Sequence, residues 1–320
     1  MKRVLSGIQP SGILTLGNYI GAMRSFVELQ ETHECNFMVV DLHAITVPQE
    51  PEVLKEQIES VAALFVACGI DPNKANLFIQ SHVPAHAMLG WIMTTLSYMG
   101  ELERMTQFKE KAEGKESVGA GLFVYPSLMA ADILIYNADL VPVGDDQKQQ
   151  LEVTRNLAER FNHKFGETFT VPEPYIPEVG ARIMSLDDAS KKMSKSNPNP
   201  GSYVSMLDEP DHIIKKLKRA KTDSDAVVKF DEKNKPEISN LLSIYAHCSG
   251  MTVDEITAKY EGQGYGKFKQ DLAECVVETL RPIQQRYYEI RQSGEIKDIL
   301  KTGAEEANKQ AEALLNVVKD

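Results

Sequence analysis

The chain has 320 residues, of which 42% are hydrophobic and 25% are charged, and its formal net charge is −11. This length predicts one large domain with one or two smaller ones, and the hydrophobic fraction is enough for a sizeable core. The acidic balance excludes a protein that binds nucleic acid over its whole surface, because phosphate contacts need clustered Lys and Arg.

Two features indicate the compartment in which the chain works. From Met1 the sequence runs directly into a short apolar segment with no cleavage site after it, and no part holds the run of about 18 apolar residues that a membrane helix requires. We therefore expect a cytoplasmic protein with no membrane span. The cysteines are widely spaced and form no CxxC pair, which favours free buried thiols over a metal site or a disulfide framework; they are Cys35, Cys68, Cys248 and Cys275.

Residues 1–145 alternate short apolar runs with helical patterns. Four runs are typical of strands, at residues 4–8, 37–42, 77–80 and 140–143. Residues 51–68 carry apolar positions at helical spacing, and Gly69 can end that helix. This alternation predicts an α/β fold, a Rossmann-like parallel sheet with crossover helices.

Residues 187–201 form the clearest loop, since Asp, Ser, Lys, Asn, Pro and Gly replace apolar positions there. After the loop, the periodicity predicts a run of helices at residues 208–220, 236–248, 253–260 and 267–291, with an amphipathic tail at 295–318. We therefore expect a Rossmann-like catalytic domain at residues 1–187, joined by the C-terminal helix 292–320. A smaller all-helical domain should occupy residues 188–291.

A glycine-rich turn follows the first strand. Residues 7–12 read Gly-Ile-Gln-Pro-Ser-Gly, residues 15–18 read Thr-Leu-Gly-Asn, and Gly21 lies one turn further on. Glycines let a phosphate or a large flat group approach the backbone, and a helix that begins near Gly17 would point its free N–H groups at anionic oxygens. Alone the signal is weak, because many α/β proteins use such a turn only to pack a helix on the sheet.

A second motif lies in the loop, where residues 192–196 read Lys-Met-Ser-Lys-Ser. Two lysines and two serines on a flexible loop can fold over a triphosphate and counter the charge that grows on departing pyrophosphate. At average composition this pentapeptide arises by chance in about one in ten thousand chains of this length. The motif therefore indicates a nucleotide site more strongly than the glycine turn does.

The two motifs resemble the H-I-G-H and K-M-S-K-S signatures of the class I aminoacyl-tRNA synthetases. The second is a complete match, while Thr15 and Asn18 replace the two histidines of the first with neutral groups that hydrogen-bond phosphate oxygens but do not titrate. Within the class, G-x-Q-P-[ST]-G followed by [HT]-x-G-N resembles the tryptophan branch of bacterial type. Further stretches resemble it over essentially the whole chain, including residues 100–109, 125–132 and 142–147.

The resemblance implies a ligase that works in two steps. L-tryptophan and ATP give tryptophanyl-adenylate and pyrophosphate, and the tryptophanyl group then passes to the 3′-terminal adenosine of tRNA(Trp). The amino acid carboxylate is already ionised at neutral pH, so no general base is needed. Catalysis should consist of positioning and charge neutralisation, with ATP taken as a substrate with Mg²⁺ and no protein-bound metal.

By the same resemblance we expect Thr15, Asn18, Lys192 and Lys195 to be catalytic. The ATP site should also use both motifs and three other segments, through Gln9, Pro10, Ser11, Gly17, Gly21, Lys111, Gly144, Asp145, Asp146, Ile183, Met193, Ser194 and Ser196. At Asp145 the tryptophan branch would carry Glu. Lys111 follows Gln107 at an i, i+4 spacing, which fits a phosphate contact or an ordinary surface pair equally well.

Asp132 is the strongest candidate for recognition of the amino acid. Its neighbours are apolar, an unusual setting for a carboxylate unless something pairs with it, and an indole N–H is a suitable donor. A helix cap or an internal salt bridge is the alternative. The resemblance completes the pocket with Leu5, His43, Tyr125, Met129, Val141, Val143 and Gln147. His43 could instead be structural, Val141 and Val143 could be plain core, and related enzymes can carry an aromatic ring at Leu5.

The implied partners are ATP, L-tryptophan and tRNA(Trp), bound by a homodimer. Residues 215–221 hold five cations in seven positions and could lie near the tRNA, or could be a solvated helix face. Residues 86–99 predict an apolar helix that the dimer could bury, although it could equally be internal core.

Three other functions are compatible with parts of the pattern. A tyrosyl-tRNA synthetase would share the fold and both motifs but would need a pocket for a phenol. A small-molecule nucleotidylyltransferase shares the glycine turn, yet it leaves the helical third and the second motif unexplained. A catalytically silent relative is disfavoured, because the motif lysines, Asn18 and Asp132 are all present.

Overall fold

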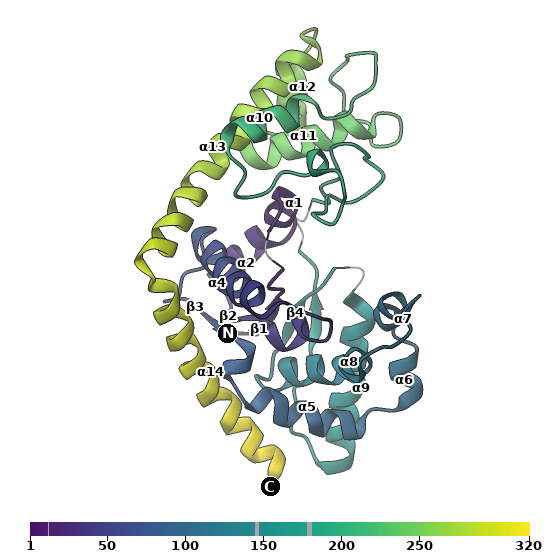
Figure 1. Cartoon of the computed structure of the whole chain (residues 1–320), viewed down its shortest axis with the longest axis vertical. Coiled ribbons are helices and arrows are strands. Elements are labelled where there is room, and N and C mark those ends of the chain that lie inside the picture. The colour runs from purple at the N-terminus through teal and green to yellow at the C-terminus, as the bar shows by residue number, and fades with distance from the viewer. Residues whose placement is uncertain (12, 145–146, 178–180) are drawn as a thin grey trace.

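Apolar runs without alternation form strands that are buried on both faces. Within residues 1–11, 13–144, 147–177 and 181–320, which the computed structural model describes, five strands form one parallel sheet in the order β3-β2-β1-β4-β5 (Figure 1). The strands are β1 Arg3–Ile8, β2 Glu34–Val39, β3 Ala75–Ile79, β4 Leu140–Pro142 and β5 Glu173–Tyr175. The expected Rossmann-like α/β fold is confirmed.

The strand order places a binding crevice beside β1. This strand pairs in parallel with β2, from Arg3 opposite Glu34 to Ile8 opposite Val39, and with β4 on its other side. The chain builds outward from β1 to β3 and then returns to add β4 and β5, so the direction of winding reverses between β1 and β4. Open α/β sheets bind ligands at the carboxyl ends of their strands at this point. The segments after β1, β2 and β4 therefore converge.

Two apolar cores form, because side chains alternate between the faces of a strand. Val4 belongs to one core and Leu5, the next residue, to the other. The first core includes one face of α4 (Pro51–Ala67) and continues into the helices that follow residue 208, whereas the second is built on α5 (Ala85–Leu96), α8 (Ala120–Leu134) and α9 (Lys148–Phe165). The other helices of this half are α1 Leu16–Asn18, the π-helix η1 Tyr19–Met23, α2 Arg24–Leu29, α3 Asp41–Ala44, η2 Gln80–His82, α6 Met99–Glu103 and α7 Thr106–Ala112.

The remaining third of the chain is helical, as predicted. After a short 3-10 turn, η4 (Pro200–Ser202), come α10 Pro210–Lys218, α11 Pro236–Ser249, α12 Val253–Lys259, α13 Gly264–Ser293 and α14 Glu295–Lys319. Figure 1 shows α10, α11 and α12 at one end of the molecule and the sheet towards the other, with α13 and α14 running along one side of both. Among the residues described, no helix is both long and apolar enough to cross a membrane.

The structure corrects one of the predicted strands and adds one that was not predicted. The second was expected at residues 37–42 but ends at Val39, and Asp41 and Leu42 lie in α3. Asp41 Oδ1 accepts hydrogen bonds from the backbone of Leu42 at 3.1 Å and of Ser81 at 3.0 Å, and such local bonding competes with strand pairing. Edge strand β5 was not predicted, because three residues with a central proline carry almost no strand signal.

Helix α14 returns to the sheet and covers its edge at β3. The two elements meet at Gly303, where a Cβ atom would lie 2.0 Å from the carbonyl oxygen of Leu77. That carbonyl belongs to backbone that cannot move without disturbing β3. Glycine is therefore required at position 303 for close approach.

We predict that Gly303→Ala lowers the free energy of unfolding by about 3 kcal/mol, because overpacking against backbone forces the helix away from the strand. Gly266→Ala in α13 is the matched control, since a Cβ atom there meets no other atom within 4 Å. It should be neutral or stabilising by up to about 1 kcal/mol. Urea denaturation of both variants and the wild type measures the difference, and equal stabilities would contradict the close approach.

Candidate active site

The turn after β1 is closed by Thr15 and Asn18. Thr15 is the N-cap of α1, and its Oγ1 accepts a hydrogen bond from the N–H of Asn18 at 3.2 Å. Asn18 Oδ1 in turn accepts from the backbone N–H of Thr15 at 2.9 Å and from its hydroxyl at 3.0 Å. This capping box uses the oxygen of the Asn18 amide, whereas the amide NH2 has no partner among the described residues. The NH2 group is therefore available to donate to an anion.

The helix that follows passes through a π-helical segment, η1, before it becomes α2. π-helical insertions are rare and frequent at functional sites. Gly21 lies in η1, and a Cβ atom there would sit 3.4 Å from the carbonyl oxygen of Ala181. The segment after β1 therefore comes close to the segment that leads into the second motif.

Two antiparallel backbone pairings assemble the site. Residues 14–16, in the first motif, pair with residues 204–206 through a bridge flanked by hydrogen bonds of 2.8 and 2.9 Å. Residues 183–185 pair with residues 191–193 in the same way, with flanking bonds of 2.8 and 3.0 Å. The second motif therefore begins as one arm of a short hairpin and does not start from an irregular loop.

The two motifs touch at Gly17. A Cβ atom there would lie 3.3 Å from Cβ of Met193 and 3.5 Å from Cβ of Ile183, so the first motif packs directly on the hairpin. Met193 and Ile183 are both buried at this contact. The structure brings together these three predicted ATP-site residues, which are far apart in sequence.

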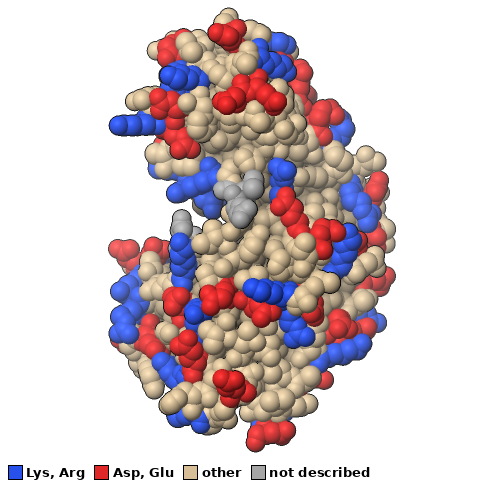
Figure 2. All heavy atoms as spheres, turned by 180° about the vertical axis from the view of Figure 1, so that it is seen from behind, with Lys and Arg blue, Asp and Glu red and all other residues tan. Residues whose placement is uncertain are grey.

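The motif lysines differ from their neighbour in how their charge is balanced. Lys191 pairs with Asp188 at 3.3 Å, whereas Lys192 and Lys195 have no carboxylate partner among the described residues. Lys192 is exposed, and Lys195 is half-buried, which lowers the pKa of its ammonium group through desolvation. Figure 2 shows Lys and Arg side chains on both sides of a notch that separates the two ends of the molecule. Unbalanced cations beside amide donors suit a polyphosphate.

Asp132 is the centre of a buried hydrogen-bond network. It lies inside α8, and only 2% of its surface is exposed. Its Oδ1 accepts from Gln80 Nε2 at 2.8 Å and lies 2.7 Å from His86 Nδ1, and its Oδ2 lies 2.7 Å from His43 Nε2. A carboxylate has about four acceptor positions, so this network leaves one for a further donor.

The network determines which ring nitrogens carry protons. A carboxylate only accepts, so His43 donates from Nε2 and His86 from Nδ1. The Nε2 atom of a neutral His86 is then an acceptor, and the hydroxyl of Tyr136 donates to it at 2.6 Å. Burial opposes a charge on Asp132, but the two histidines outweigh burial and hold its pKa below the ordinary value. The centre of the network is a stable anion.

Tyr125 links this network to α7 and α9. Its ring meets the ring of His43 edge-on, with the centroids 6.2 Å apart. Its hydroxyl donates to Gln107 Oε1 at 3.2 Å and accepts a hydrogen bond from Gln150 Nε2. Gln107 thus turns inward, while Lys111, one helical turn later, is exposed. The side chains that hold Tyr125 come from three helices.

The apolar residues predicted for the pocket lie in the second core. Leu5, Val141 and Val143 are buried there, and Met129 packs against it. This placement fits a pocket wall and plain core equally. Gly144 and Gln147 are exposed just beyond β4, whereas Asp145 and Asp146 lie outside the described residues.

Comparisons with known proteins identify the family of this chain. Residues 1–281 match the family model for class I tRNA synthetases (W and Y). The chain is 62% identical to the tryptophan–tRNA ligase of Bacillus anthracis over 320 residues, which cover 100% of this chain and 97% of that protein. The chain belongs to the class I tRNA synthetase family.

Solved structures of this synthetase family have the same fold. The tryptophanyl-tRNA synthetase of Mycoplasma pneumoniae superposes with a TM-score of 0.89 at 39% identity, covering 99% of this chain and 96% of that one. The enzyme from Campylobacter jejuni, solved with ADP and tryptophan, gives 0.86 at 36% identity and covers 99% and 98%.

Sequence reasoning missed two of the three partners of the central carboxylate in this synthetase, Gln80 and His86. Gln80 was assigned to the end of a strand and His86 to an apolar helix, and neither Tyr136 nor Gln150 was considered. Gln80 had a usable signal, because a polar residue at the carboxyl end of a buried parallel strand faces the crevice. His86 and Tyr136 had none, since one polar residue on an apolar helix does not reveal its partner.

The lysine-rich run of the synthetase lies on α10 and just after it. Lys216 pairs with Asp208 at 2.6 Å and also lies over the ring of Tyr203. The backbone N–H of Lys221 donates to the carbonyl of Leu186 at 2.8 Å, which joins the run to the segment before the second motif. The run therefore has structural contacts, and a role in binding RNA stays a prediction.

We predict that Tyr136→Phe lowers the free energy of unfolding by about 1–3 kcal/mol, because it leaves the buried Nε2 of His86 without a donor. Tyr288→Phe removes the same atom from a ring that is 49% exposed and should change stability little. Guanidinium denaturation at neutral pH compares the two. A Tyr136 variant as stable as the Tyr288 control would show that the chain of hydrogen bonds is not required.

Proposed function

We propose that this synthetase is a tryptophan–tRNA ligase. It joins L-tryptophan to ATP, releases pyrophosphate, and transfers the tryptophanyl group from the adenylate to the 3′-terminal adenosine of tRNA(Trp). The observation that carries the proposal is the direct contact between the two signature motifs, at the same edge of the sheet as a buried carboxylate network. The whole-length similarity to tryptophan–tRNA ligases supports the choice of amino acid.

In the first step a carboxylate oxygen of tryptophan forms a bond to the α-phosphorus of ATP. The bond from that phosphorus to its bridging oxygen breaks, and the electron pair leaves with pyrophosphate. No proton moves, so the protein supplies position and charge and not a base. Mg²⁺ enters bound to ATP as part of the substrate. Lys192 and Lys195, which have no carboxylate partner among the described residues, neutralise the leaving group.

The first motif holds ATP from the other side. Thr15 orients Asn18 through the capping box, and the Asn18 NH2 donates to a phosphate oxygen. The glycines let the nucleotide approach the backbone. We assign the rest of the ATP site to Gln9, Pro10, Ser11, Gly17, Gly21, Lys111, Gly144, Asp145, Asp146, Ile183, Met193, Ser194 and Ser196.

The amino acid lies against the carboxylate network. The indole N–H donates to the remaining acceptor position of Asp132, and a phenylalanine ring would leave that position unused. His43, Tyr125, Gln147, Met129, Leu5, Val141 and Val143 form the rest of the pocket. Selection then depends on one buried hydrogen bond, whose loss costs about 1–3 kcal/mol.

The second step needs a tRNA and a second subunit. We assign anticodon binding to the helical domain at residues 188–291, and the catalytic domain to residues 1–187 with helix 292–320. A homodimer would cover the apolar side chains that α5 and α6 expose, since Trp91 is 68% and Met99 is 65% exposed. The enzyme would work in the cytoplasm, where ribosomes use the charged tRNA.

Pyrophosphate exchange into ATP tests the function directly. With each amino acid supplied separately, we expect exchange with tryptophan and background rates with tyrosine and phenylalanine. Exchange with tyrosine alone would replace the proposal with a tyrosyl-tRNA synthetase. If none of the amino acids supported exchange, the activation step would be rejected.

We predict that Lys195→Ala lowers the rate of adenylate formation by about a hundredfold and leaves tryptophan affinity unchanged, because the ammonium contact strengthens as charge moves to pyrophosphate. Lys191→Ala is the control, since its exposed side chain is already paired with Asp188. Single-turnover kinetics with saturating ATP measures the rate. A similar loss in tryptophan affinity would remove Lys195 from this role.

We predict that Asp132→Asn weakens tryptophan binding at least tenfold, because a neutral amide is a poorer acceptor and also leaves the two histidines without their anion. Asp139→Asn makes the same change at a carboxylate that accepts from Arg3 N at 2.8 Å, outside the pocket. Calorimetry with tryptophan compares the two variants. Unchanged affinity in Asp132→Asn would exclude direct contact with the indole.

A further inference from the structure

The side chain of Asn240 forms two hydrogen bonds with the backbone of one residue, Met184. It lies in α11 with 6% of its surface exposed. The N–H of Met184 donates to Asn240 Oδ1 at 2.8 Å, and Asn240 Nδ2 donates to the carbonyl of Met184 at 2.9 Å. An amide side chain carries one acceptor and one donor side by side, which match the donor and acceptor of one residue. Both ends of the amide are thus used to fix the place of Met184.

Met184 is the residue that pairs with the first lysine of the second motif. Its antiparallel bridge is to Lys192, and its neighbour Ile183 packs on Gly17 together with Met193. A shift of Met184 therefore moves both the lysine and the surface that meets the first motif. The amide of Asn240 is therefore one backbone pairing away from Lys192.

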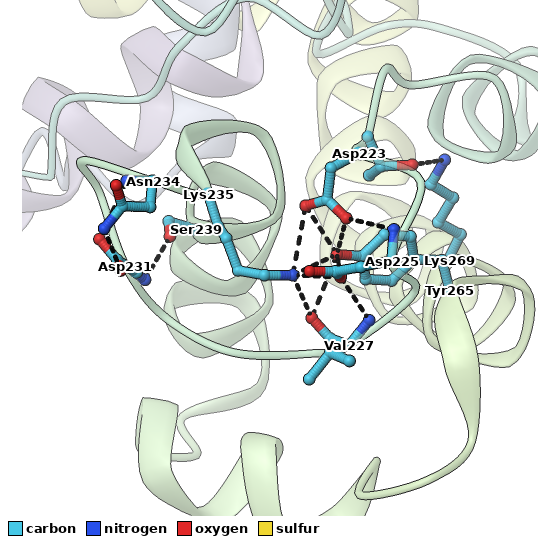
Figure 3. A network of polar contacts seen from close by, with 10 residues as sticks. Asp223, Asp225, Val227, Asp231, Asn234, Lys235, Ser239, Tyr265 and Lys269 are labelled. Carbon is cyan, nitrogen blue, oxygen red and sulfur yellow. Dashed lines mark hydrogen bonds and ion pairs between the residues drawn. The ribbon is translucent and has the colours of Figure 1, made fainter.

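The N-terminal end of α11 is itself fixed. Lys235, the residue before the helix, donates to Asp225 at 2.6 Å, to the carbonyl of Val227 at 2.8 Å and to the hydroxyl of Tyr265 at 2.9 Å (Figure 3). The bond from Lys235 holds the pKa of Asp225 at about 2. These contacts fasten the segment before α11 to the start of α13. Asn240 therefore extends from a rigid support.

The other end of α11 reaches the helix that follows the first motif. Arg24, which follows η1 directly, donates from Nη1 to the carbonyl of His247 at 2.8 Å. Carbonyls in the last turn of a helix have no partner within the helix, so this bond satisfies one of them. A hollow of about 250 Å³ lies between α2 and α11 beside the bond. Helix α11 thus contacts the segments that carry both motifs.

We propose that Asn240 is a positioning residue that makes the second-motif hairpin move with α11, and so sets where Lys192 stands relative to Gly17. The proposal rests on the ATP role assigned to that motif. A purely structural asparagine would change stability alone. A positioning residue also changes the use of ATP, and it leaves the tryptophan pocket unaffected because that pocket is built on other elements.

The test compares Asn240→Ala and Asn240→Asp with Asn36→Ala. Asn36 is also buried, and its side chain bonds to Asn76 at 2.9 Å and to Gln310 at 3.3 Å, away from both motifs. The measurements are kcat and KM for ATP in pyrophosphate exchange, tryptophan affinity without ATP, and the free energy of unfolding. The exchange assay uses whichever amino acid the wild type activates. If the wild type does not respond to tryptophan, the proposed function fails, and the effect of the Asn240 variants on the use of ATP is still measured.

We expect both Asn240 variants to lose about ten- to a hundredfold in kcat/KM for ATP, with tryptophan affinity within about twofold of the wild type. Asn36→Ala should lose stability and keep its kcat/KM. Asn240→Asp keeps the acceptor for the N–H of Met184 and loses the donor to the carbonyl of Met184.

Unchanged kcat/KM for ATP in variants that are destabilised like Asn36→Ala would overturn the proposal. Equal losses in tryptophan affinity and in ATP use would also overturn it, because they indicate general disruption. If Asn240→Ala does not fold, the result for Asn240→Asp alone tests the proposal. This variant keeps the volume of the side chain and the acceptor for the N–H of Met184.

Discussion

The site depends on backbone pairing between segments that are distant in the chain. Residues 14–16 follow the first strand, and their partners at 204–206 follow the second motif. Without this pairing and the hairpin at 183–193, Gly17 and Met193 would belong to separate bodies joined by flexible chain. Backbone pairing fixes position and makes few demands on the side chains involved. Lys192 and Lys195 consequently have no carboxylate partner among the described residues, although both motifs are held in place.

The buried anion at Asp132 imposes a different kind of order. An unpaired carboxylate with 2% exposure would be strongly destabilising, so the fold brings Gln80, His43 and His86 to it from three separate segments. These partners occupy three of the about four acceptor positions of the carboxylate and leave one unused. In the proposed function, a preformed network with one unused acceptor position favours a ligand that can donate to it, because such a ligand adds a hydrogen bond and does not have to break any.

The sequence was sufficient for most of the sheet and for the C-terminal helices, and it was insufficient for the edge strand β5 and for the contacts between segments. The order of strands and helices, the second motif and the importance of Asp132 all follow from periodicity, rare motifs and an apolar setting for a charge. The roles of Asn240 and His86 do not follow from the sequence. Each role depends on which other segment packs against the helix that carries the residue, and the spacing of residues along a helix does not identify that segment. The early end of β2 was also hidden, since Val40 and Leu42 are as apolar as the strand itself.

The close approach of α14 to β3 affects how the chain reaches its fold. β3 is an edge strand of the sheet, and Gly303 lies against the outer side of its backbone. Until α14 arrives, that edge has unpaired N–H and C=O groups that can recruit a strand from another molecule. The contact joins positions 77 and 303, so loop closure delays it relative to local structure. Aggregation during refolding should therefore begin at β3, and a chaperone that shields this edge would increase the yield of native enzyme.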